Sequence, residues 1–129
     1  MSLATTRLSI ETKFLADWAV AQPTIPVAVE NMPFSPPEEA HWIRLSIQPL
    51  NNLHNGLNEC RELIGMVAVQ VYSPVRQGTA TQDELVDSAQ AILTGAHNDI
   101  AYEDADIAPL GEVEGWYQCN IFVGFTTKG

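Results

Sequence analysis

The side chains with the greatest chemical potential lie close together in one short segment. Cys60, His54 and Asn58 fall within seven residues of one another. A thiol, an imidazole and an amide are the groups that a cysteine nucleophile uses with its base and its orienting partner. In such sites the partners are usually distant in sequence and are brought together by the fold. Because these three are local and lie in an asparagine-rich stretch, we expect a surface loop here and not a catalytic site.

Metal-binding and phosphate-binding patterns do not stand out either. The three histidines lie in three different segments without a second ligand at metal spacing: His41, His54 and His97. Glu103, Asp104 and Asp106 offer oxygen ligands for a hard cation, but they lack the spacing and the final bidentate glutamate of a calcium loop. The sequence contains no phosphate-cradling glycine loop and no G-x-S-x-G motif. We therefore expect no catalytic residue, metal ligand or cofactor, and a protein that is not an enzyme.

The charge of the chain argues against a nucleic-acid partner. The sequence has 16 acidic and 6 basic residues, giving a net charge of -10, whereas binding to phosphates needs clustered lysine and arginine. No segment approaches the roughly 18 apolar residues of a membrane span, and the N-terminus shows no secretion signal. Without such a signal, Cys60 and Cys119 favour free thiols over a disulfide. We expect an acidic protein that binds neither nucleic acid directly nor a membrane.

The N-terminal third predicts a helix, a short strand and a proline-rich arm. Residues 5–21 form an amphipathic helix whose apolar face contains Leu8, Phe14, Leu15, Trp18 and Ala19. Residues 25–29 predict a short strand at a sheet edge. Residues 30–40 contain three prolines, so neither a helix nor a central strand is expected there. This arm, with Met32 and Phe34, lies either over its own core or on a neighbouring subunit.

The middle of the chain predicts a long antiparallel hairpin. In residues 42–48 and 63–72 aliphatic side chains recur at every second position, which is typical of half-buried strands. Ile43, Leu45, Ile47, Val67, Val69 and Val71 are expected on the core face. Residues 49–60 read as a polar loop with an Asn55-Gly56 turn, and loops of this length are often functional.

The C-terminal part predicts one more helix and one more hairpin. Residues 81–96 begin with a Thr81–Glu84 capping box and carry an apolar stripe of Leu85, Ala89, Ile92, Leu93 and Ala96. Residues 98–109 read as an acidic loop, followed by a hairpin of residues 111–114 and 116–125. Together the elements predict one domain, residues 1–129, of the α+β class. Its sheet is mixed, mostly antiparallel and of about four to five strands, with two main helices packed on one face.

The second face of this sheet is expected to be half apolar. Its large side chains are Trp42, Met66, Tyr72, Trp116 and Phe122. With helices on the other face only, these side chains would lie in water, and large exposed apolar patches usually mark partner surfaces. Aromatic residues and methionine are also enriched in interface cores. The alternative is that the arm and loops of the same chain cover this face.

The order of the motifs resembles one known family. An amphipathic helix and a proline-rich segment precede W-I-R-L-S-I at residues 42–47. After a loop, R-E-L-I-G-M-V-A-V-Q-V-Y-S-P-x-x-x-G at residues 61–78 leads into a helix, and W-Y-x-C-N-I-F-V-G-F at residues 116–125 closes the pattern. Over residues 5–126 the chain resembles the tail terminator-like, or tail completion, proteins of long-tailed bacteriophages and prophages.

The resemblance implies a structural virion assembly protein. Such proteins form homo-oligomeric rings, commonly hexameric, on the finished tail tube, where they end tail polymerisation and form the head-joining surface. The implied partners are other copies of the chain, the tail tube protein and the head–tail connector or neck proteins. The implied location is the virion tail, after assembly in the host cytoplasm. Two alternatives stay open: another neck or head–tail joining component, and a small ligand-binding or enzymatic α+β domain.

Nine residues are our candidates for contacts between subunits or with the tube. They come from the hairpin tip, the arm, the second sheet face and two of the scarce bases, which are candidates for salt bridges across subunits. The candidates are Met32, Phe34, Trp42, Arg44, Asn52, His54, Asn55, Tyr72 and Arg76.

Overall fold

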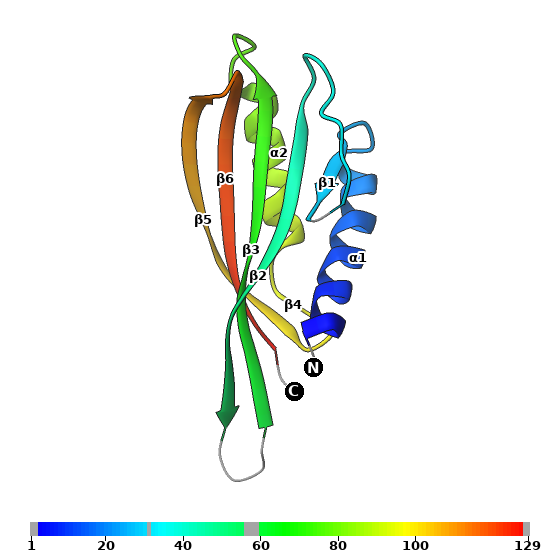
Figure 1. Ribbon diagram of the computed structural model, residues 1–129, viewed down its shortest axis with the longest axis vertical. Helices are drawn as coiled ribbons and strands as arrows, with labels where there is room; N and C mark the ends of the chain where they lie inside the picture. Colours follow the sequence, from blue (N-terminus) through cyan, green and yellow to red (C-terminus); the bar gives the residue numbers. More distant parts are fainter. Residues whose placement is uncertain (1–2, 31, 56–59, 128–129) are drawn as a thin grey trace.

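The computed structural model describes residues 3–30, 32–55 and 60–127, with side chains described outside residues 51–62. The elements are α1 (Leu3–Ala21), β1 (Val27–Val29), β2 (Trp42–Asn55), β3 (Cys60–Pro74), α2 (Ala80–Ile92), β4 (Ala96–His97), β5 (Ile100–Val113) and β6 (Trp116–Thr127). The strands form one sheet in the order β1-β2-β3-β6-β5-β4 (Figure 1). Strand β1 runs parallel to β2, and the other neighbouring strands are antiparallel.

The α+β class and the mixed, mostly antiparallel sheet are confirmed. The sheet has six strands, however, and not the four to five that we expected. The additional strand is β4, Ala96–His97, where our predicted second helix ended at residue 96. The segment that we interpreted as an acidic loop, residues 98–109, lies mostly in β5, of which we predicted only residues 111–114. The alternation of β5 is broken by register shifts between Tyr102 and Ala105 and between Pro109 and Gly111. These irregularities and the solvent-facing acids hide the strand from a search for period-two patterns.

The last hairpin is confirmed at its turn. Glu114 and Gly115 connect β5 to β6 with φ values of 52° and 85°. Two consecutive residues with positive φ form the turn that matches the natural twist of a hairpin. The turn therefore sets the register in which Val113 pairs with Trp116.

The central hairpin is longer than predicted. Strand β2 continues to Asn55 and β3 begins at Cys60, so most of the expected loop, residues 49–60, is strand. A register shift between Pro49 and Asn51 lets the ladder continue past the proline. The expected turn at Asn55-Gly56 lies partly outside the described residues.

Helix α1 buries a different face from the one that we predicted. Thr6, Ile10, Phe14 and Trp18 follow one another at a spacing of four and are buried. Leu8 is 66% exposed and Leu15 is 37% exposed, so their expected place in the core is wrong. The helix carries two apolar stripes, and tertiary packing selects the one that contains both aromatic side chains.

Helix α2 begins earlier than the predicted capping box. Thr79 occupies the N-cap position without a side-chain hydrogen bond, so the predicted role of Thr81 as the cap is wrong. Leu85, Ala89 and Leu93 are buried as expected, whereas Ala96 lies beyond the helix in β4 and is exposed. Neither described helix has the length and apolar character to cross a membrane.

Both helices pack on the same face of the sheet. The core contains the inward-facing residues of β2, β3 and β6 together with the buried faces of α1 and α2. The predicted alternation is confirmed, since Ile43, Val67, Val69 and Val71 are completely buried. Each such aliphatic side chain contributes about 1.5–3 kcal/mol when it is removed from water.

Gly65 is the point of closest approach between β3 and its neighbours. A Cβ atom here would lie 2.5 Å from Cζ of Phe125 and 2.8 Å from the backbone oxygen of Gln48. Phe125 is fully buried and has no room to retreat. Only glycine therefore fits at this crossing.

We predict that Gly65→Ala lowers the free energy of unfolding by about 1–3 kcal/mol because of this overpacking. Gly124→Ala is the matched control on β6. The Cβ atom of that variant would meet Oε2 of Glu103 at 2.7 Å, which is the end of an exposed side chain that can rotate away. Urea unfolding should show a loss for Gly65→Ala and almost none for Gly124→Ala, and equal losses would contradict this packing.

Candidate assembly surface

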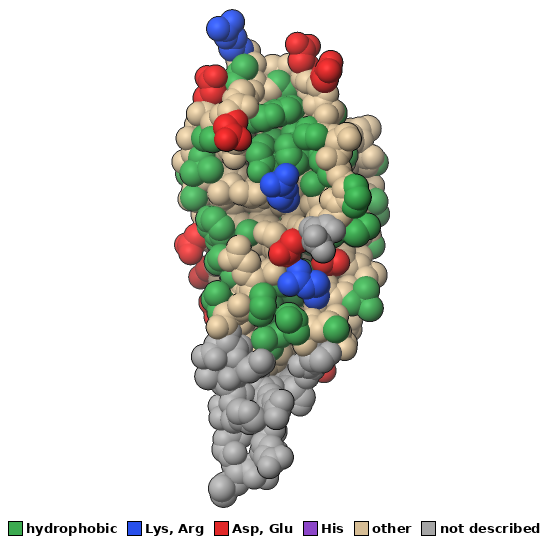
Figure 2. Space-filling view, in the orientation of Figure 1, with side chains coloured by type: hydrophobic (Ala, Val, Ile, Leu, Met, Phe, Trp, Pro, Cys, Tyr) green, Lys and Arg blue, Asp and Glu red, His purple; other side chains and the backbone are tan. Residues whose placement is uncertain are grey.

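A second, smaller core lies on the sheet face that points away from the helices. We call it the aromatic cluster: Phe34, Trp42, Tyr72 and Trp116. Trp42 stacks on Tyr72 with ring centroids 4.0 Å apart and on Phe34 at 5.0 Å. Trp116 meets Trp42 edge-on at 5.9 Å. Figure 2 shows hydrophobic side chains gathered in the upper part of this face.

The aromatic cluster decides between our two alternatives for this face. Trp42 is 3% exposed and Tyr72 is 8% exposed, as in the alternative that the same chain covers them. The arm supplies the cover, because Phe34 reaches back from its proline-rich segment onto Trp42. Of our two alternatives for the arm, the structure shows the one in which it lies over its own chain. The indole Nε1 of Trp42 has no hydrogen-bond partner among the described residues.

Arg44 lies beside this cluster and remains exposed. Its guanidinium carbon is 5.5 Å from the ring centroid of Trp42 and 5.9 Å from that of Tyr72. Burial raises the pKa of Tyr72, and the charge of Arg44 opposes that rise. Arg44 forms no ion pair with any described residue. Its hydrogen-bond donors are therefore presented to solvent on a rigid aromatic support.

The other candidate residues are spread over the surface. Arg76 lies in the turn between β3 and α2 with φ of 67° and lines a shallow hollow with Trp116 and Glu39. Met32 is 65% exposed. The remaining candidates lie on the distal part of β2, where the structure describes the backbone and not the side chains: Asn52, His54 and Asn55.

One feature that sequence reasoning missed caps an edge of the sheet. Beyond Leu45, β2 has no strand partner on the β1 side among the described residues. At Ile47 two side chains replace that partner. Glu30 accepts a hydrogen bond from the Ile47 N–H at 3.1 Å, and Arg7 donates to the Ile47 carbonyl at 3.1 Å. Arg7 and Glu30 also pair with each other at 2.6 Å, so they bind both backbone groups of one edge residue.

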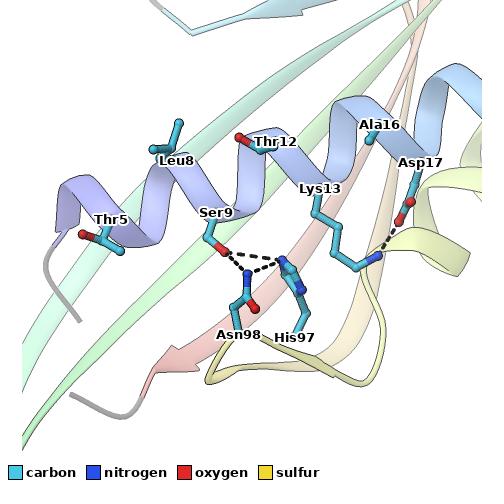
Figure 3. Close-up of a pocket in the computed structure, with 9 residues that line it drawn as sticks. All are labelled: Thr5, Leu8, Ser9, Thr12, Lys13, Ala16, Asp17, His97 and Asn98. Carbon is cyan, nitrogen blue, oxygen red and sulfur yellow. Dashed lines mark hydrogen bonds and ion pairs between the residues drawn. The ribbon is translucent and has the colours of Figure 1, made fainter.

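A polar cluster connects α1 to β4 and lines a hollow of about 600 Å³ (Figure 3). The Ser9 hydroxyl lies 3.3 Å from Nε2 of His97, and the Asn98 amide donates to the same hydroxyl at 3.1 Å. Asn98 also lies 3.3 Å from Nε2 of His97, so two of the three contacts meet at one imidazole nitrogen. The cluster thus fastens the short strand to the helix. Among the described residues, no three histidine, cysteine or acidic side chains gather as a metal site.

Comparison with known proteins gives this geometry a context. A model of the family described as phage tail terminator protein matches residues 7–97, which is more than half of the chain. One solved structure without a functional name is 20% identical, with a TM-score of 0.75 over 98% of this chain and 96% of its own. Another, from the virion of a native gene transfer agent particle, is 14% identical, with a TM-score of 0.62 over 95% and 92% of the two chains. No curated protein sequence matches the chain.

These findings define the class as that of phage tail structural proteins. The two solved structures share the fold along nearly the whole chain. The chain itself belongs to the phage tail terminator family, as its motifs predicted. This is a family of structural proteins and not of enzymes.

The cap that Arg7 and Glu30 form at Ile47 predicts that the free energy of unfolding depends on pH. Burial works against ionisation of Glu30, but the hydrogen bonds from Ile47 and Arg7 and the Arg7 charge outweigh it, so the pKa lies below its usual 4.5. A lowered folded-state pKa stabilises the protein fully above the unfolded value, and this contribution is lost as the pH falls through the folded value. Glu30→Gln should therefore lower the unfolding free energy by up to about 1 kcal/mol at pH 7 and by less at pH 2.5, as measured by urea unfolding.

Glu38→Gln, at an exposed position of the arm, controls for the loss of one negative charge. A deficit for Glu30→Gln that is as large at pH 2.5 as at pH 7 would contradict the proposed role of its carboxylate.

From the stacking in the aromatic cluster we predict that Phe34 keeps the arm packed against the sheet. Phe34→Ala removes a half-buried ring from the stack and should make local opening easier by about 1–3 kcal/mol. Cleavage after Glu38 or Glu39 by a glutamate-specific protease should then accelerate about tenfold or more. Met32→Ala changes an exposed residue of the same arm and should leave the rate unchanged. Equal rates for the two variants would show that the Phe34 contact does not fasten the arm.

Proposed function

We propose that this protein forms a ring on the end of the phage tail tube, ends tube polymerisation and presents the surface to which the head is joined. Membership of the tail terminator family supports termination as the role. The structural neighbour in a gene transfer agent particle shows that the fold occurs in a virion. A hexamer on the tail, bound to tail tube protein on one side and to connector or neck proteins on the other, is the form that the sequence resemblance favours.

The observation that carries the proposal is the projecting end of the β2–β3 hairpin. Strand β6 pairs with β3 only from Ile64 onward. The pairing of β2 with β3 continues past that point, beyond Asn51 on β2 and back to Cys60 on β3. The hairpin therefore extends beyond the sheet as a two-stranded ribbon (Figure 1). Isolated two-stranded ribbons are marginally stable in water. A second surface that receives the ribbon would stabilise it, and the tail tube or the neighbouring subunit is the proposed surface.

The remaining candidate residues have assigned places in this proposal. Arg44, exposed on its aromatic support, and Arg76, at the opposite end of β3 from the hairpin, are the proposed partners for acids of adjacent copies. Trp42 and Tyr72 are buried in the chain, and Phe34 is partly buried against them. These three residues act through Arg44 and the arm. Since acids outnumber bases by 16 to 6, each exposed arginine has many potential carboxylate partners. Met32 is the proposed apolar contact of the arm.

A shortened hairpin tests this proposal. Asn52 pairs with Leu63, so residues 53–62 can be replaced by Asn-Gly, a two-residue hairpin turn. Because the sheet core begins at Leu63 on β3, the variant should fold with a nearly unchanged unfolding midpoint. It should fail to bind purified tail tubes, and an infected cell that expresses it should accumulate tails of uncontrolled length.

The control keeps the hairpin and truncates an exposed side chain elsewhere, as in Val20→Ala. Unchanged tail binding and tail completion by the shortened variant would overturn the role of the hairpin. Binding of the wild-type protein to isolated connectors but not to tubes would favour the alternative of a neck component.

A further inference from the structure

The outer edge of β5 is open for strand pairing. Strand β4 pairs with β5 only at Ile100 and Ala101, and β5 is otherwise the outermost strand on its side of the sheet (Figure 1). From Glu103 onward, no strand in the described part of the chain lies on that edge. Between its two register shifts, β5 keeps a regular register with β6 from Ala105 to Pro109. An edge strand of this kind presents unpaired backbone groups to which another strand can be added.

A groove lies along the helix-facing side of this edge. Ile107 pairs with Ile121, which belongs to the core under the helices, so Ile107 also points to the helix side. It is nevertheless 47% exposed, so no described side chain completes the packing at this margin. The space between α2 and β5 has a volume of about 480 Å³. Its floor is apolar and contains Val86, Ile107, Pro109 and Cys119.

The rim of this groove is acidic. Asp83 and Asp87 line it from α2, and residues four apart are neighbours on one helix face. Neither carboxylate forms an ion pair within the described ranges. Burial raises the pKa of the Cys119 thiol, and the charge of Asp83 raises it further, so this charge acts on the floor of the groove.

The helix alone does not account for both acids. Asp83 lies in the first turn of α2, where the helix dipole favours a negative charge. Asp87 lies one turn later, where that benefit has faded. Like charges at this spacing repel each other, and a cation placed between them would relieve the repulsion.

An apolar floor and an acidic rim together fit the side chain of arginine or lysine. Such side chains lay their methylene stems along apolar surface and keep the charged head in polar surroundings. Arginine also pairs with carboxylates through two parallel hydrogen bonds. In a strand added to β5, every second side chain would point to the helix side and so into the groove.

We propose that the outer edge of β5 binds an extended basic segment of a different protein as an added strand, with an arginine or lysine side chain in the groove between Asp83 and Asp87. A second copy does not supply such a strand, because each described strand carries at most one lysine or arginine. The acidic β5 of another copy would be repelled. The inference goes beyond the proposed ring, since it concerns a separate surface and a partner of different composition.

Fluorescence anisotropy of the full chain with a labelled peptide of about nine residues, in which arginine alternates with threonine, tests the proposal. The wild type should bind this peptide and should not bind the same peptide with glutamate in place of arginine. Methylation of one alternate set of its backbone nitrogens should abolish binding, because those N–H groups pair with β5. Methylation of the other set should not. Hydrogen exchange in the complex should slow at residues 103–109 of β5.

The rim is tested by Asp83→Asn with Asp87→Asn, which should raise the Kd of the arginine peptide about tenfold or more. Glu38→Gln with Glu84→Gln is the matched control, because it also removes two negative charges at exposed positions that do not line the groove. The control should bind the peptide like the wild type. All four positions are exposed, so the unfolding midpoints should agree.

The floor is tested by Ile107→Lys, which places a like charge where the basic side chain should lie and should also raise the Kd about tenfold or more. Val20→Lys adds the same charge on α1, where Val20 is 84% exposed, and should leave the affinity unchanged.

Each contrary outcome overturns a stated part of this proposal. Equal weakening by both double variants would reduce the binding to attraction by the net charge and overturn the groove. Tight binding of both methylated peptides would overturn strand addition. A wild type that does not bind the arginine peptide would overturn the proposal as a whole. Tail binding by the shortened hairpin variant is a separate readout, so any of these results leaves the proposed ring standing.

Discussion

The stack of Phe34 on Trp42 on Tyr72 is the interaction on which the outer half of this molecule depends. Two helices cover one face of the sheet, and the other face still presents large aromatic rings that water solvates poorly. The arm closes the upper part of that face with a single ring. By doing so it fixes the path of residues 32–41 and leaves Arg44 exposed on a rigid support. This small domain therefore has one core on each face of its sheet.

Once both faces are covered at the upper end, the surfaces that remain open are those at the margins of the sheet. One margin is capped by Arg7 and Glu30 at Ile47, and the other carries the acids of β5 together with its exposed Ile107 and Leu110. The hairpin leaves the body at the far end. A subunit with unlike sides and a projecting ribbon suits lateral repetition around a tube axis together with contact along that axis. This division of the surface is the structural basis on which we propose the ring.

The sequence predicted the parts of the fold in which alternation is strict and failed where it is broken. Ile43 and Val67 to Val71 identified the central strands because their core-facing aliphatic side chains recur at every second position. The first part of strand β5 was missed because two register shifts break its period and its acids face solvent. On α1 the period of the helix was clear, but Leu8 and Leu15 compete with Ile10 and Phe14 for the core, and only the packed structure decides between them.

The candidate site was predictable in kind and not in detail. Trp42 and Tyr72 were identified as residues of the second face and Phe34 as part of the arm, but sequence alone does not distinguish an arm that folds back onto its own chain from one that lies on a neighbouring subunit. The Arg7–Glu30 cap joins residues 23 positions apart in sequence to a backbone edge, a relation that no local pattern encodes. The family, by contrast, followed from motifs spread over most of the chain and was confirmed by the family match.

The most direct test of the central claim is cryo-electron microscopy of tail tubes polymerised in the presence of this protein, with tube length measured on the same grids. The account predicts a closed ring of several copies at one end of each tube, with the hairpins directed toward the tube and a narrow distribution of lengths. Tubes that keep growing at both ends with no added density, or with single copies bound along their sides, would contradict it.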